Sequence, residues 1–211
     1  MSDRPPFDDL DDDALRRLAP TLGLHASEVF ILAVRNVPDD LAPAELTRRS
    51  GVGSLLRWHA SRMTVDQVAQ LRRFVDDLPV RTRPRTRPFP SDGREPTAGT
   101  LLRRLLNNRN IDLDAPLLML VGGGPYVSTS TYSMAFADRI PMRDEFVNAV
   151  ARLTGIPLER LAPLVGLDVA PTPWPFDHAW PEDVVALGWA ARRLDDDQLL
   201  AAENFARELR P

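Results

Sequence analysis

The sequence predicts an all-α protein, and two observations support this fold class. Apolar residues recur at intervals of three and four through most of the chain, as they do on one face of an amphipathic helix. Helix-capping residues and terminating glycines flank several of these stretches. Only residues 117–121 have the composition of a β-strand, and five residues are too few to change the prediction.

The N-terminal part of the chain contains two well-marked helical patterns. In the first, Gly23 ends a stripe that consists of Leu10, Leu15, Leu18 and Leu22. The second covers residues 64–78, where Thr64 and Gln67 have the spacing of a capping box. Its apolar stripe consists of Val65, Val68, Leu71, Val75 and Leu78.

The C-terminal part continues in the same way, with helices predicted over residues 98–109, 142–154 and 157–165. Pro157 suits the first turn of the last of these helices. A final helix is predicted near the end of the chain, with an apolar stripe at Leu199, Ala202, Phe205, Ala206 and Leu209. Since few later residues could cover this stripe, we expect it to pack against residues 64–78 or against a second chain, and we predict a homodimer.

Composition excludes several classes of function. The chain has 211 residues, of which 44% are hydrophobic and 27% charged, and it contains neither cysteine nor lysine. Disulfides, thiol catalysis, Schiff-base chemistry and a lysine-dependent phosphate loop are therefore excluded. We expect a cytoplasmic protein that does not interact with membranes, because the sequence contains neither a long apolar run nor a signal-peptide core.

A proline-rich basic stretch divides the chain. Residues 80–98 carry five arginines against two acidic residues and have no apolar period, which is typical of an extended linker. The predicted organisation is an N-terminal helical unit (1–79), this linker, a central module (99–170), and a proline- and tryptophan-rich connector with a capped terminal helix (171–211). We expect the connector to be rigid, with its aromatic rings covering the helical core, rather than a ligand groove.

The chain also contains an internal repeat. Residues 56–79 match residues 187–210 at eight of 24 positions, among them Trp58 with Trp189 and Phe74 with Phe205. A weaker match upstream extends the relationship, so that residues 1–79 relate to residues 146–210. The predicted fold therefore has two related helical units, which surround the central module.

Three motifs in the central module resemble a known family. Residues 100–114 resemble the first helix and turn of Cro/repressor-type (XRE-like) helix-turn-helix domains. Residues 127–133 with 138–141 resemble the recognition helix and its following loop, and residues 143–165 resemble the last two helices. The resemblance covers residues 98–167 and implies a lambda-repressor-like helix-turn-helix module.

The resemblance also implies a site and a function. In that family the third helix reads base edges in the major groove, which gives base-facing roles to Ser128, Thr129, Ser130 and Ser133. Phosphate contacts are implied for Arg103, Arg104 and Arg139. The basic linker could follow a groove or the phosphates through Arg81, Arg83, Arg85 and Arg87, or be a solvated spacer. The first hypothesis is thus a transcriptional regulator that binds duplex DNA.

Departures from the family pattern support a second hypothesis. The turn at residues 121–126 is about five residues longer than in the family, and we interpret its three glycines as a flexible turn. The reading face has no arginine, glutamine or asparagine, and residues 99–170 are neutral overall. The alternative is a protein-interaction scaffold that has kept the fold but no longer binds DNA.

No motif indicates an enzyme. The three histidines stand apart from one another, and there is no Gly-x-Ser-x-Gly elbow or dinucleotide-binding glycine pattern. We therefore expect no catalytic residues, no metal and no cofactor.

Overall fold

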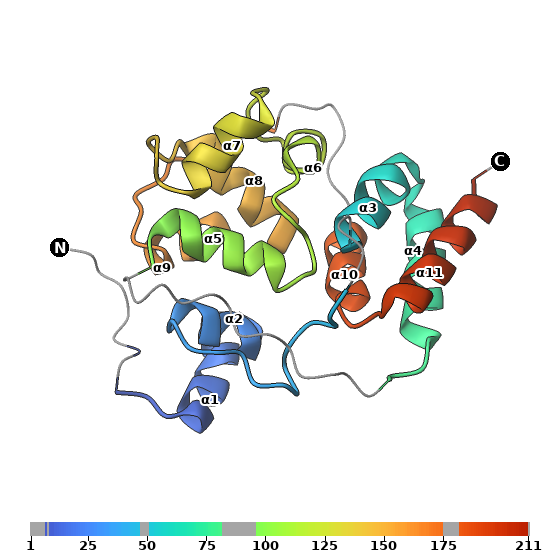
Figure 1. Ribbon diagram of the computed structural model, residues 1–211, viewed down its shortest axis with the longest axis horizontal. Helices are drawn as coiled ribbons and strands as arrows, with labels where there is room; N and C mark the ends of the chain where they lie inside the picture. The colour runs from blue at the N-terminus through green and yellow to red at the C-terminus, as the bar shows by residue number, and fades with distance from the viewer. Residues whose placement is uncertain (1–6, 8, 47–50, 82–95, 175–181, 211) are drawn as a thin grey trace.

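A computed structural model describes residues 7, 9–46, 51–81, 96–174 and 182–210. In these residues it contains eleven α-helices and one short 3₁₀ helix, and no strand (Figure 1). The predicted all-α fold class is confirmed.

The chain begins with a helix pair. Helix α1 (Asp12–Leu22) is capped by the side chain of Asp11 and ends at Gly23, whose φ of 62° lies in the left-handed region. Helix α2 (Ala26–Leu32) follows after a short turn and packs on α1. Most of α2 is buried, so it lies between α1 and the rest of the molecule.

Five helices form the second group: α5 (Ala98–Asn107), α6 (Ala115–Leu120), α7 (Thr129–Phe136), α8 (Asp144–Thr154) and α9 (Leu158–Leu164). The strand considered for residues 117–121 is wrong, because these residues lie in α6 and its C-cap. Helix α6 starts where the Asp114 side chain accepts a hydrogen bond from the N–H of Leu117 at 3.0 Å. Its apolar run is buried among helices, a setting that composition alone does not distinguish from a sheet.

The third group combines helices from before the basic linker with the last two helices of the described chain. It contains α3 (Gly51–Trp58), the 3₁₀ helix η1 (Ala60–Arg62), α4 (Val65–Asp77), α10 (Glu182–Ala191) and α11 (Asp196–Glu208). Both α10 and α11 pack against α3 and α4. Capping boxes begin both α4 (Thr64 with Gln67) and α11 (Asp195 with Gln198).

The apolar stripe of α11 is covered within the chain. Leu199, Ala202 and Ala206 are buried, and Phe205 stacks on Phe74 of α4. The stripe thus has an intramolecular partner, the first of the two expected arrangements. The homodimer stays a prediction, now without an uncovered stripe to support it.

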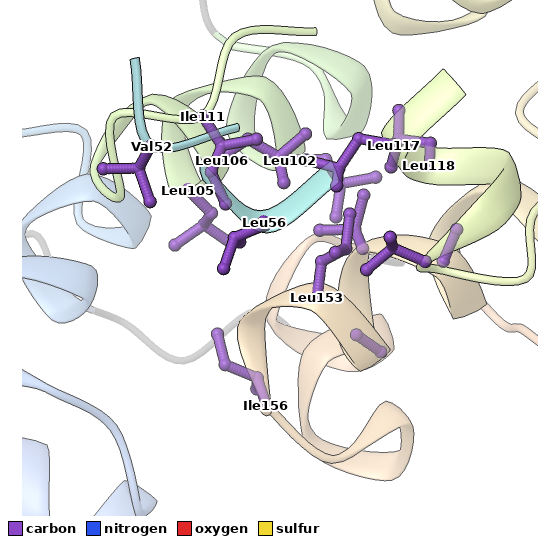
Figure 2. Packing of buried hydrophobic residues seen from close by; sticks show 14 of the residues in the cluster. Val52, Leu56, Leu102, Leu105, Leu106, Ile111, Leu117, Leu118, Leu153 and Ile156 are labelled. Atoms are coloured by element: carbon purple, nitrogen blue, oxygen red, sulfur yellow. The ribbon is translucent and has the colours of Figure 1, made fainter. Parts of the chain in front are cut away.

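One hydrophobic core connects these groups. Figure 2 shows side chains from α3, α5, α6 and α8 meeting in it, including Leu56, Leu102, Leu117 and Leu153. The core thus contains residues from both sides of the basic linker. No helix in the described part of the chain is long and apolar enough to cross a membrane.

A buried polar junction fixes α2 against the loop after α5. Arg109 and Glu28 form an ion pair at 2.5 Å, and both residues are almost fully buried. Arg109 also donates to the carbonyl of Thr154 at 2.7 Å. Close by, the His25 ring stacks on Trp189 of α10 with centroids 3.4 Å apart. The two contacts hold α2 against the second and third helix groups.

Candidate nucleic-acid interface

Helix α7 carries the predicted reading face, and its opposite face is anchored in the core. Tyr132, Ala135 and Phe136 are buried. The rings of Tyr132 and Phe136 both meet the ring of Phe146 on α8 edge to face, with centroids 4.9 and 6.3 Å apart. The orientation of α7 is therefore set by packing, which leaves its other face toward solvent.

The four predicted base-facing residues lie together on that exposed face. Ser128, Thr129, Ser130 and Ser133 are all exposed. Ser128 is the N-cap: its hydroxyl accepts from the N–H of Thr131 at 3.2 Å and shares a 2.8 Å hydrogen bond with the hydroxyl of Ser130. The face thus presents hydroxyl groups, which can both donate and accept, and no charged side chain.

The long turn between α6 and α7 is tightly packed. A Cβ atom on Gly122 would lie 2.7 Å from the carbonyl oxygen of Leu118, and one on Gly124 would lie 2.6 Å from the Tyr132 hydroxyl. That hydroxyl donates to the carbonyl of Pro125 at 2.9 Å. The glycines do form a turn, as predicted, but close contacts with α6, α7 and α8 hold it in place.

Two of the predicted phosphate-contacting arginines are exposed near α7. Arg139 follows the helix directly, and Arg103 lies on α5, which packs against α7. Arg104 is half-buried. Farther along, Arg143 binds Glu145 at 2.5 Å, and this hydrogen bond lowers the pKa of Glu145. Because Glu145 neutralises it, Arg143 adds little to the positive charge beside the hydroxyl face.

Arg81, at the start of the basic linker, is not part of this surface. Its guanidinium forms an ion pair with Asp195, the N-cap of α11, at 2.7 Å. Partial burial raises the pKa of Asp195, but hydrogen bonds from Gln198 and Arg81 outweigh it and lower that pKa. The C-terminal end of α4, which Arg81 follows, lies away from α7 in Figure 1. Arg83, Arg85 and Arg87 lie outside the described residues.

The sequence did not indicate that apolar side chains border the hydroxyl face. Tyr126 is 93% exposed, Leu120 57% and Met134 39%. Tyr126 and Leu120 also line a hollow of about 500 Å³ beside the glycine turn. One signal could have indicated this for Tyr126: it lies within the predicted turn, outside any apolar period, where a side chain is usually exposed.

Comparison with known proteins gives no match: no family model, curated protein or solved structure is significantly similar to this chain. The site must therefore be interpreted from its own residues.

Proposed function

We propose that this protein is a DNA-binding transcriptional regulator that inserts α7 into the major groove of duplex DNA. The proposal is carried by one observation: four hydroxyl side chains share the exposed face of α7, while buried aromatic rings fix its other face. A helix held in this way can project short polar side chains to base edges, as helix-turn-helix proteins do.

The chemistry of this face suits modest but sequence-dependent binding. Serine and threonine hydroxyls donate to or accept from base edges, and the threonine methyl group can contact the methyl group of thymine. Arg139 and Arg103, exposed beside α7, supply phosphate contacts that set its position without reading sequence. With so few cations, we expect a shallow salt dependence.

Filter binding with pooled genomic fragments tests the proposal. Ser133→Glu places a carboxylate on the reading face, and we expect it to abolish discrimination between fragments. Gln70→Glu is the matched control, because it adds the same charge at an exposed position of α4. If both variants select the same fragments as the wild type, α7 is not the reading helix.

The second candidate is a protein-interaction scaffold, which the exposed apolar side chains around the glycine turn favour. Leu120 and Tyr126 would suit an apolar protein partner better than a phosphate backbone. This candidate predicts that the folded wild-type protein shifts no DNA fragment even at low salt.

A further inference from the structure

A positively charged surface, separate from the α7 site, lies on the third helix group. It is formed by Trp58 at the end of α3, Arg57 beside it, Arg62 on η1, and Arg207 and Arg210 at the C-terminal end of the chain. Trp58 is 46% exposed, and the guanidinium carbons of Arg57 and Arg62 lie 4.5 and 5.4 Å from its ring centroid. Arg210 donates to the Trp58 carbonyl at 2.7 Å, which brings the end of the chain onto this surface.

The charge of this Trp58 surface is predominantly positive. Arg57 is neutralised by Asp114 at 2.9 Å, but Arg62, Arg207 and Arg210 form no ion pair with the described residues. The positive charge of these arginines affects the pKa of His59, which is buried beside them. Burial lowers the pKa of His59, and Arg207, Arg210 and Arg62 lower it further, against the opposite effect of Glu203. Arg62, Arg207 and Arg210 thus all lie close enough to His59 to lower its pKa.

Trp189, which matches Trp58 in the internal repeat, lies in a different environment. Its ring is covered by the stacked His25 ring and by Arg192, whose guanidinium carbon lies 4.4 Å from the ring centroid. Trp189 therefore belongs to an internal junction. Trp58, by contrast, faces solvent and holds charged groups at the surface.

We infer that the Trp58 surface binds the phosphate backbone of duplex DNA next to the segment contacted by α7. This inference rests on the proposed function and extends it. Guanidinium groups already lie over the Trp58 ring, so the indole fixes positive charge and does not offer a platform for an unstacked base. The exposed guanidinium group of Arg62, held over this ring, suits phosphate oxygens, which it can bind with two parallel hydrogen bonds.

The fold connects this surface to the reading helix. Helix α3 packs against α6, and α6 packs against α7. The ion pair between Arg57 and Asp114 strengthens the first of these contacts, since Asp114 caps α6. Helices α7, α6 and α3 follow one another across the upper half of Figure 1. The hydroxyl face of α7 and the Trp58 surface are thus linked through helices that pack directly on one another.

The test measures how the affinity of the full chain for random-sequence duplex DNA depends on salt. The variant is Arg62→Gln with Arg207→Gln, two exposed residues outside the α7 site. The control is Arg17→Gln with Arg73→Gln, which removes the same charge from exposed positions on α1 and α4. Circular dichroism is used to check that both double variants remain folded.

We expect the slope of log affinity against log salt to fall by about 1.8 in the variant, since each phosphate contact contributes about 0.9. The loss of affinity between about 50 and 200 mM salt would then be roughly tenfold smaller than in the wild type. The control should keep the wild-type slope. Adding DNA should also change the tryptophan fluorescence of the wild-type protein, and Trp58→Phe should remove this change.

The possible outcomes separate the two proposals. If the wild type binds DNA and the Arg62/Arg207 variant behaves like its control, the inference about the Trp58 surface is overturned and the role of α7 stands. If the variant shows the expected smaller slope but Ser133→Glu selects the same fragments as the wild type, the phosphate contact at the Trp58 surface stands and the reading role of α7 fails. A wild-type protein that binds no duplex DNA overturns both.

Discussion

Phe74 on α4 and Phe205 on α11 stack face to face, with ring centroids 4.4 Å apart and planes inclined by 11°. The repeat predicted from the sequence aligns these two residues, and the two segments that it pairs contact each other through them. Two further hydrogen bonds support this contact: Gln67 donates to the carbonyl of Leu209 at 2.6 Å, and Gln198 donates to that of Pro79 at 2.8 Å. The capping glutamine of each helix thus binds the chain near the end of the other helix.

We expect Phe205→Asp to lower the free energy of unfolding by about 3 kcal/mol, because it removes the stacked ring and places a carboxylate against Phe74. Leu200→Asp is the control, since Leu200 is exposed on the same helix and its replacement should cost about 0.5 kcal/mol. Urea denaturation followed by circular dichroism measures both. Equal destabilisation by the two variants would show that the stack contributes nothing.

The buried pair of Glu28 and Arg109 should behave as a coupled unit. Arg109→Met leaves the Glu28 carboxylate buried and unpaired, and we expect a loss of about 3–5 kcal/mol. Adding Glu28→Gln should recover part of this loss, because the amide oxygen can still accept from the N–H of His25, as Glu28 does at 2.9 Å. A double-mutant cycle measures the coupling. Simple additivity of the two changes would contradict it.

Stability should fall with acidification because of two histidines. Burial lowers the pKa of both His25 and His59 below the ordinary value of 6.5, against the opposing effects of Glu28 and Glu203. As pH falls below about 6.5, the unfolded chain takes up these protons before the folded chain does, so unfolding becomes more favourable. Thermal unfolding from pH 7.5 to 5.5 measures this effect. The variant His25→Gln with His59→Gln should show a smaller decrease than the wild type, and an equal decrease would exclude the histidines as the cause.

The glycine turn offers a test of how α7 is positioned. Gly122→Ala should destabilise the protein, because its Cβ atom would lie within 3 Å of backbone atoms of both Leu118 and Ala149. Gly53→Ala on α3 is the control: its Cβ atom would make only ordinary van der Waals contacts with Leu117 and Ile111, and alanine is the better helix former by about 0.5–1 kcal/mol. Thermal denaturation should move in opposite directions for the two variants. A stabilised Gly122→Ala protein would mean that the turn is loose.

Sequence periodicity predicted much of the helical structure, since apolar stripes and caps are local signals. The capping box at Thr64 and Gln67 and the terminating Gly23 both lie where these signals placed them. The strand considered for residues 117–121 was wrong because a short buried helix also produces a continuous apolar run. Its real start signal, the cap at Asp114, needed the structure to be recognised.

The candidate sites depended more on long-range packing. Ser128 and Ser133 are exposed because Tyr132 and Phe136 fix the rotation of α7; their role in reading DNA stays a prediction. The Trp58 surface could not be predicted, since it unites residues near position 60 with residues near position 208. No local pattern shows that Arg210 reaches the carbonyl of Trp58.

The proposed contact of α7 with the major groove can be tested directly, because the chain contains no cysteine and a single thiol can be introduced. Ser133→Cys introduces a single thiol on the reading face, to which a DNA-cleaving reagent can be attached. On a duplex selected by the wild-type protein, we predict cuts confined to a few base pairs within the bound site. The same reagent on Gln70→Cys, at an exposed position of α4, should produce no localised cuts. Diffuse or absent cleavage by folded Ser133→Cys protein bound to that duplex would contradict the reading role of α7.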